Sequence, residues 1–288
     1  MAIYENPVAR DDVNVTAHSS LGEFVQLSLA LAAGLVVLVV ALTYGFRWVA
    51  PWIPFGFEQR IAAPVAARLA PASEAPAKQR YLQNLAEQLG QHMDLPAGMQ
   101  LQLHWSNSRE PNAFATLGGH IAIHQGLLDS VQSENGLAMV LAHEIAHVRH
   151  RDPLVSAGSG LILASSMALL LGSGSESIVG RTTAALTQLQ FSRQQEQAAD
   201  AAALNALLAH YGHLQGADEF FAAMQAQSQS LLQQAQPEFL QTHPDSAKRL
   251  ALIRNAAKQA ALDLQAEQLQ RTALPAFVTA ASAATRQK

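Results

Sequence analysis

The chain contains no cysteine among its 288 residues. Disulfide bonds and thiolate metal sites are therefore excluded, and any metal ion must be held by histidine, aspartate or glutamate. Charged residues are few, at 14%, and the net charge of −4 gives no reason to expect a nucleic-acid partner. No regular repeat is present. Hydrophobic residues make up 49% of the chain, which is enough for one sizeable domain with an appendage.

Charge is absent altogether from residues 24–46, which are mostly apolar. A helix of this length can cross a bilayer core of about 30 Å at about 1.5 Å per residue. Tyr44, Trp48 and Trp52 cluster at its far end, as interfacial anchors do. The stretch also lacks the basic start and the short apolar core of a signal peptide. We therefore predict a transmembrane helix over residues 24–48, with a buried helix as the alternative.

The sequence H-E-I-A-H at residues 143–147 lies inside an apolar run and fits the pattern H-E-x-x-H. On a helix, residues four apart share one face, so His143 and His147 can offer two imidazole nitrogens to one ion. Glu144 is rotated by roughly 100° from His143, where it can take a proton from a water molecule beside the ion. Ser133 is the expected N-cap of this helix. The pattern is typical of a catalytic zinc site and predicts one Zn²⁺ per chain.

A zinc ion held by two histidines needs a third protein ligand. Glu196 is the strongest candidate by pattern, because Asp200 follows one turn later on the same helix face. Asp200 can then accept an N–H from a ligand histidine and fix its tautomer. The pattern alone also fits a solvated helix face. The other downstream candidates remain open: Glu176, Asp200, Glu219, Glu238, His210, His213 and His243.

Short strands are expected upstream of this motif. Apolar and polar residues alternate over 101–105, and segments 112–116 and 120–124 flank a Gly-Gly pair, which predicts a hairpin. We expect His120 and His124 to be polar residues of the surface or of the hairpin, with a metal role as the alternative. Together with the helical patterns elsewhere, these segments predict a mainly α fold with a small β-sheet.

Helical patterns follow the motif. The apolar run 154–171 is interpreted as a helix that packs on the domain or dips into the membrane interface, with a second span as the alternative. Two further helices are expected over 182–211 and 217–232, and a last basic helix follows His243.

Four motifs in order resemble the HtpX and CAAX-prenyl-protease group of gluzincin metallopeptidases, peptidase family M48. The H-E-I-A-H motif is followed by S-R-Q-Q-E-Q-A-A-D at 192–200, which is similar to the family's E-x-x-A-D segment. P-N-A-F-A at 111–115 resembles the strand before the zinc helix, and H-P-D-S-A-K-R at 243–249 resembles the family's H-P-x-x-x-x-R segment. The resemblance covers roughly residues 78–255.

The resemblance implies that His143, His147 and Glu196 bind zinc and that Glu144 is the catalytic base. It also implies three supporting residues. Asp200 would orient a ligand histidine. His243 would help to bind substrate or stabilise the oxyanion, and Arg249 would support the residues around His243.

The resemblance further implies polypeptide substrates, held by an edge strand that pairs with the substrate backbone. The residues of this strand are Asn112, Ala113, Phe114 and Ala115. The implied activity is that of a membrane-anchored zinc-dependent endopeptidase, in protein quality control of misfolded or membrane-proximal proteins. The alternative is a chaperone-like or latent zinc-binding module without turnover. A single convincing span makes the chain similar to the single-anchor members.

The predicted organisation has five parts: a polar tail (1–23), a transmembrane helix (24–48), a juxtamembrane linker (49–77), a gluzincin-type zinc metallopeptidase domain (78–260) and an Ala/Gln-rich tail (261–288). This predicts an integral membrane protein, in the inner membrane if bacterial. Arginines after the span favour a cytoplasmic catalytic domain by the positive-inside rule, but they are too few to decide the side. The sequence does not indicate an oligomeric state.

Overall fold

The computed structural model describes residues 20–69, 75–171, 189–230, 238–243, 246–263 and 270–279. These residues are mostly helical, and the three strands among them form one small sheet, which confirms the predicted fold class. The α-helices are α1 (Ser20–Val49), α2 (Phe55–Leu69), α3 (Pro76–Gly90), α4 (Gln125–Ser130), α5 (Glu134–His150), α6 (Asp152–Leu171), α8 (Arg193–Tyr211), α9 (Glu219–Ser230), α10 (Glu238–Thr242), α11 (Ser246–Asp263) and α12 (Ala276–Thr279). The strands and 3₁₀ turns are β1 (Gln102–Ser106), β2 (Ala113–Ala115), β3 (His120–His124), η1 (Ala50–Trp52) and η2 (Leu117–Gly119).

The sheet has the strand order β1-β3-β2, so β2 lies at one edge. β1 runs parallel to β3, and β2 pairs with β3 in an antiparallel hairpin, which confirms the predicted hairpin. Gly118 and Gly119 have φ of 77° and 81°, a left-handed conformation that suits glycine. A Cβ on Gly119 would also overlap the carbonyl of Gln100, so this turn has no room for a side chain.

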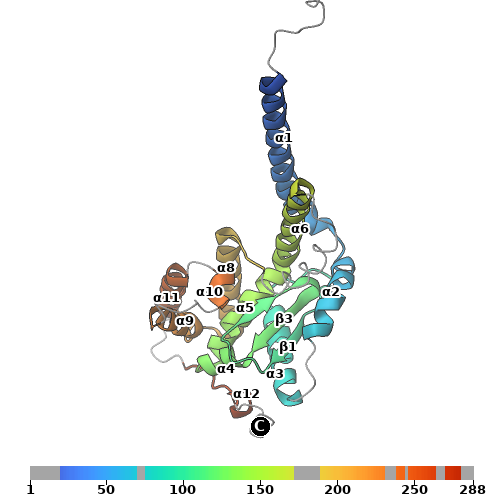
Figure 1. Cartoon of the computed structure of the whole chain (residues 1–288). Helices are drawn as coiled ribbons and strands as arrows, with labels where there is room; N and C mark the ends of the chain where they lie inside the picture. The colour runs from blue at the N-terminus through green and yellow to red at the C-terminus, as the bar shows by residue number, and fades with distance from the viewer. Residues whose placement is uncertain are drawn as a thin grey trace, which may run out of the picture.

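The helix that carries the H-E-x-x-H pattern, α5, is the centre of the core. Its residues from Asn135 to Val148 are all buried. Ser133 is its N-cap, as predicted, and accepts a hydrogen bond from the backbone N–H of Gly136 at 3.2 Å. In Figure 1 the sheet and α2 lie to one side of α5, while α8, α9, α10 and α11 lie to the other. The histidines of the motif are thus held by a helix that cannot move independently of the domain.

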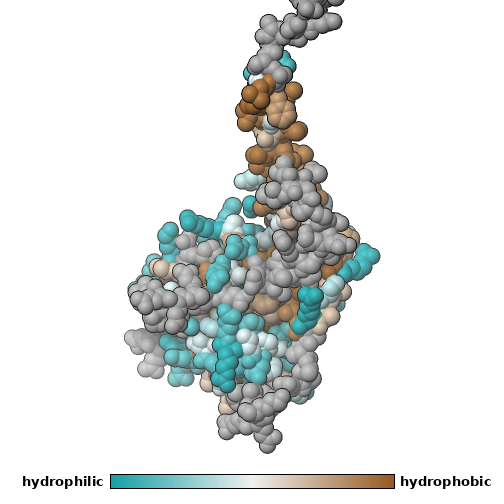
Figure 2. All heavy atoms as spheres, in the orientation of Figure 1, coloured by the Kyte–Doolittle hydropathy of each residue, from teal (hydrophilic) through white to brown (hydrophobic). Residues whose placement is uncertain are grey.

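The first helix, α1, extends away from the domain and carries much of the molecule's exposed apolar surface (Figures 1 and 2). Among the described residues, the segment Leu21–Trp52 is the one helical stretch that is long and apolar enough to cross a membrane. The central residues of this segment make no buried contact with the domain. The helix therefore has the length and composition of a membrane anchor, as predicted.

The segment predicted as a juxtamembrane linker contains a helix, α2, that packs on the domain. Within it, Glu58 is 2% exposed and pairs with Arg151 at 2.7 Å between Oε2 and Nε. Its other oxygen accepts a hydrogen bond from the N–H of Gly118 at 2.9 Å. Helix α2 is thereby joined both to the hairpin turn and to the end of α5. The division of the chain into five parts stays a prediction.

Two helix boundaries differ from the predicted ones. The helix expected from residue 182 begins at Arg193, because Ser192 and Gln195 form a capping box that sets its first turn. Residues 182–188 lie outside the described residues. The helix expected over 217–232 is α9, Glu219–Ser230.

His120 lies in the hairpin, as expected, but its side chain is buried rather than at the surface. It is 5% exposed, and its Nδ1 lies 2.9 Å from Nε2 of His104 on the neighbouring strand. Burial, together with the nearby His120, lowers the pKa of His104 to about 4, and burial lowers the pKa of His120 as well. Both rings are therefore neutral in the folded protein near pH 7.

This pair makes stability dependent on pH. The pKa of His104 falls from 6.5 to about 4 on folding, so the unfolded chain binds an extra proton within this window. The melting temperature of the detergent-solubilised protein should therefore fall as the pH is lowered from 6.5 to 4. His104→Gln should show a shallower fall, because it removes the group whose pKa changes most in this pair. Equal slopes for His104→Gln and wild type would contradict the prediction.

Candidate metal centre and active site

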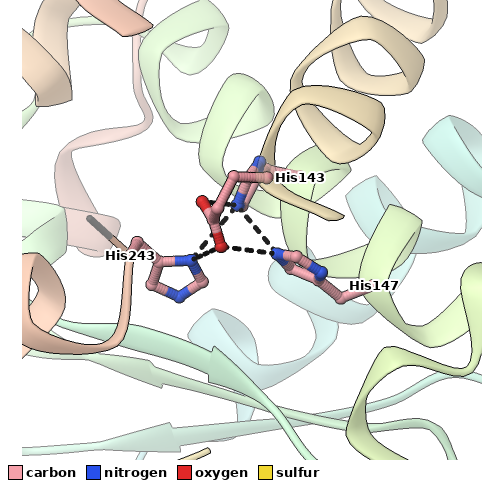
Figure 3. A group of neighbouring side chains, drawn as sticks. His143, His147 and His243 are labelled. Atoms are coloured by element: carbon pink, nitrogen blue, oxygen red, sulfur yellow. Dashed lines mark hydrogen bonds and ion pairs between the residues drawn. The ribbon is translucent and has the colours of Figure 1, made fainter. Parts of the chain in front are cut away.

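Four buried side chains place their donor atoms within 4.8 Å of one another: His143, His147, Glu196 and His243. Figure 3 shows the three imidazole rings pointing toward a common centre. The Nε2 atoms of His143 and His147 are 3.0 Å apart. Glu196 Oε1 lies 3.4 Å from Nε2 of His147 and 2.9 Å from Nδ1 of His243. The structure thus brings together both predicted histidine ligands and the predicted carboxylate ligand.

Three separate elements supply these donors. His143 and His147 lie one turn apart on α5, as the helical spacing predicts. Glu196 is in the first turn of α8, where the Ser192 cap fixes its direction. His243 directly follows α10 and stacks on Phe239, with ring centroids 4.6 Å apart. The centre therefore forms only when α5, α8 and the end of α10 are packed together.

The charges around this centre fit a cation. The carboxylates of Glu144, Asp152, Glu196 and Asp200 are all buried, and the buried guanidinium of Arg249 pairs with two of them, Glu196 and Asp200. Burial would raise the pKa of Glu196, but the three histidines beside it hold that pKa well below its usual range. Buried anions need compensation by cations. Imidazole and carboxylate donors suit a divalent transition metal such as zinc.

His143 is oriented by a buried carboxylate–guanidinium pair. Its Nδ1 lies 3.0 Å from Oδ1 of Asp200. Arg249 donates to both oxygens of Asp200, at 2.9 and 2.8 Å, and its Nη1 lies 2.7 Å from Oε2 of Glu196. Burial would raise the pKa of Asp200, but its partners His143 and Arg249 lower it to about 2. Asp200 and Arg249 thus occupy the supporting positions that the sequence predicted.

The second histidine of the motif, His147, has a carboxylate partner that the sequence analysis missed. Nδ1 of His147 donates to Oδ2 of Asp152 at 2.8 Å, and Gln195 donates to Oδ1 of the same carboxylate at 2.8 Å. The ring of His147 also stacks on Phe191, with centroids 4.0 Å apart. An aspartate directly before Pro153, at the start of a new helix, was the only sequence signal for this position. Its contact with His147 depends on the turn between α5 and α6.

Glu144 points toward the same centre without joining the donor group. Its Oε2 accepts a hydrogen bond from the backbone N–H of Ala115 at 2.8 Å. Its Oε1 is buried without a hydrogen bond and lies 3.7 Å from Nε2 of His243. A buried carboxylate oxygen without a donor is rare in folded proteins and suggests a functional reason. This arrangement suits a base held beside the metal centre.

The predicted substrate strand lies next to Glu144. Its residues are all buried: Asn112, Ala113, Phe114 and Ala115. The backbone bonds Thr116 N–H to His120 O and His124 N–H to Asn112 O direct alternate residues of this strand toward β3. The N–H of Ala115 therefore faces the free edge of the sheet, where it meets Glu144.

The remaining ligand candidates lie elsewhere or cannot be placed. Glu219 accepts hydrogen bonds from Ser133 at the start of α5, and His210 pairs with His92 at 3.4 Å. Glu176 and the side chain of Glu238 lie outside the described residues.

Comparison with known sequences identifies a family. The profile of Peptidase family M48 matches residues 76–257, which is more than half of the chain. This match confirms the predicted resemblance. It runs from the start of α3 into α11 and includes all four residues of the candidate metal centre.

Among the similar curated proteins is the beta-barrel assembly-enhancing protease of Escherichia coli (strain K12), 31% identical over 209 residues. The alignment covers 66% of this chain and 41% of that protein. A protease HtpX homolog of Acidiphilium cryptum is 30% identical over 58% of this chain and 70% of its own length. The mitochondrial metalloendopeptidase OMA1 of Schizosaccharomyces pombe is 30% identical over 53% of this chain and 45% of its own length.

Asp152 should matter for metal affinity although it does not touch the centre. Removing a carboxylate partner of a ligand histidine typically weakens metal binding about 10–100-fold. We expect Asp152→Ala to show a loss of this size in a competition titration of Zn²⁺ with a chromophoric chelator. The control is Asp218→Asn, at an exposed ion pair with Arg254, and it should bind as the wild type does. An unchanged affinity in Asp152→Ala would refute this assignment.

Proposed function

We propose that this chain, which belongs to peptidase family M48, is a membrane-anchored zinc metalloendopeptidase. One observation carries the proposal. Donors from the H-E-x-x-H helix and from Glu196 converge in a buried centre, and the carboxylate of Glu144 is held beside them with one oxygen lacking a hydrogen bond. A site built for structure alone has no use for such a carboxylate.

The residues that would hold zinc are His143, His147 and Glu196. When bound there, zinc supplies a Lewis acid that activates water and polarises a carbonyl group. Asp200 and Asp152 fix the two imidazole rings so that each presents Nε2 to the centre. Arg249 holds Asp200 and Glu196 in place and balances their charge.

Glu144 would take the proton from the attacking water and pass it to the leaving amine. The hydrogen bond from Ala115 fixes one of its oxygens and leaves the other free for this transfer. The edge of β2 would pair with the backbone of an extended polypeptide substrate through Asn112 to Ala115. Substrate on this edge lies directly beside the base, because Ala115 already contacts it.

His243 would donate a hydrogen bond to the oxyanion of the tetrahedral intermediate. Its Nε2 lies 3.7 Å from Oε1 of Glu144, and its Nδ1 lies 3.3 Å from Nε2 of His143. In this structure His243 is grouped with the three residues that would hold zinc. To act on the oxyanion, its ring would donate from Nε2, which has no hydrogen-bond partner here.

The anchor and the relatives' names suggest the substrates. Helix α1 would hold the catalytic domain at a bilayer, on a side that neither the sequence nor the fold decides. The relatives are named as proteases, one of them as enhancing beta-barrel assembly. This chain spans only about 41% of that protein's length, so its own substrates are a proposal: misfolded or membrane-proximal proteins. The latent zinc-binding module remains the weaker alternative.

The roles of the two acidic residues can be separated. Glu144→Gln should keep about one zinc per chain and lower peptide cleavage by about 10²–10⁴-fold, because it removes the base alone. Glu196→Ala should lose zinc as well. Zinc content and cleavage of an unstructured protein such as casein are measured on the same samples. Glu87→Gln, on the exposed face of α3, is the control. Retained turnover in Glu144→Gln would contradict the proposed mechanism.

His243→Ala tests the oxyanion role. Three donors remain, so zinc should stay bound, while kcat should fall about 10²–10³-fold with little change in KM. Metal analysis measures the zinc content, and single-turnover cleavage measures the rate of the chemical step. A rise in activity would instead show that the fourth donor restrains the site in the resting protein.

A further inference from the structure

Helix α6 is apolar but is not enclosed by the domain. After Asp152 it carries no charged residue up to its end at Leu171. Leu161 and Leu163 nevertheless have exposed fractions of 47% and 56%. In Figure 1 the helix leaves the domain and runs beside the lower part of α1. Two apolar helices therefore extend from the same side of the domain.

A close contact fixes how the two helices lie against each other. A Cβ on Gly158 would overlap the ring of Phe46, whereas a Cβ on Gly160 would meet no atom within 4 Å. Helix α6 thus approaches α1 through a small residue at position 158. Close approach at small residues is characteristic of helices that pack within membranes.

This contact also determines how far α6 would reach into the membrane. Phe46 is the last residue of the uncharged part of α1, and Trp48 and Trp52 follow it at 81% and 85% exposure, as residues at a membrane interface do. The two helices run in opposite directions, so the residues after Gly158 lie beside the apolar residues before Phe46. Residues 159–171 rise about 20 Å at about 1.5 Å per residue, which is well into a hydrocarbon core of about 30 Å.

Two of the serine hydroxyls of α6 have hydrogen-bond partners within the protein. The hydroxyl of Ser166 donates to the carbonyl of Ile162 at 2.8 Å, so its donor is satisfied within the helix. Ser156, nearer the domain, donates to the carbonyl of Gln190 at 3.1 Å.

We propose that α6 and the adjoining half of α1 enter the bilayer together as an antiparallel pair, and that lipid acyl chains cover Leu161 and Leu163. The proposal rests on the anchoring role of α1 in the proposed function. Its consequence concerns substrates. Asp152, the first residue of α6, is bonded to His147 and lies only about 9 Å along the helix from Gly158. The metal centre would then lie at the bilayer surface, within reach of polypeptide segments that emerge from the membrane.

The absence of cysteine makes the test direct, since single cysteines need no prior substitutions. Leu163→Cys is compared with Leu38→Cys in α1 and with Leu252→Cys on α11, three leucines with similar exposed fractions of 56%, 53% and 44%. The full chain is reconstituted in phosphatidylethanolamine/phosphatidylglycerol vesicles. Each variant is labelled with a membrane-impermeant maleimide, and separately with a bimane dye in vesicles that contain nitroxide-labelled acyl chains.

Leu163→Cys should react at least tenfold more slowly than Leu252→Cys, and its bimane should be quenched as it is at Leu38. Labelling at the rate of Leu252, without quenching, would overturn the proposal and leave the anchor intact. Protection without quenching would show that protein, not lipid, covers the face, and would also overturn it. If Leu38 reacts like Leu252, the anchoring role itself fails. None of these readouts requires an active enzyme.

The packing register is tested with two matched glycines. In the Leu163→Cys background, Gly158→Val should separate α6 from α1 and increase maleimide labelling several-fold. Gly160→Val makes the same change toward open space and should leave labelling unchanged. Protection of Leu38→Cys in the Gly158→Val chain shows that the anchor is still inserted. Equal labelling in both valine variants would overturn the Gly158 contact as the basis of the depth assignment.

Discussion

The buried pair of Arg249 with Asp200 is the interaction on which the metal centre depends most. It joins α11 to α8, orients His143 from behind and places a positive charge beside Glu196. Removing one partner of a buried charged pair is strongly destabilising, because the other is left uncompensated in a low-dielectric interior. The buried carboxylates outnumber this guanidinium, so a bound metal cation would balance part of the remaining negative charge. Folding of the domain and metal binding would then be coupled.

Much of this site was predictable because it follows helix periodicity. The spacing of His143 and His147, and of Glu196 and Asp200, places each pair on one face of a helix, and the structure shows both pairs there. Arg249 and the β2 edge were predictable only through resemblance to known motifs, since no local pattern links them to α5. Their contacts are made between elements far apart in sequence.

Other features depend on tertiary contacts that leave no periodic signal. Asp152 meets His147 only because α5 ends in a sharp turn, and a lone aspartate before a proline is also an ordinary helix start. Helix α2 lies within residues 49–77, which were predicted to be a juxtamembrane linker. Glu58, Ala62 and Val65 are buried against the domain and hold this helix despite Pro64 within it. The burial of His120 likewise reflects its packing against His104 on the neighbouring strand.

Arg151 alone separates the last residue of α5 from the first residue of α6, and its φ of 61° makes the turn between them. Its side chain is held by Glu58 and by the carbonyl of Ile53 at 3.0 Å. The connection between α5 and α6 is therefore short and held on both sides. A change in the tilt of α6 would be transmitted to its first residue, Asp152, which is hydrogen-bonded to the ring of His147. The thickness of the surrounding bilayer would then act mechanically on the geometry of the metal centre.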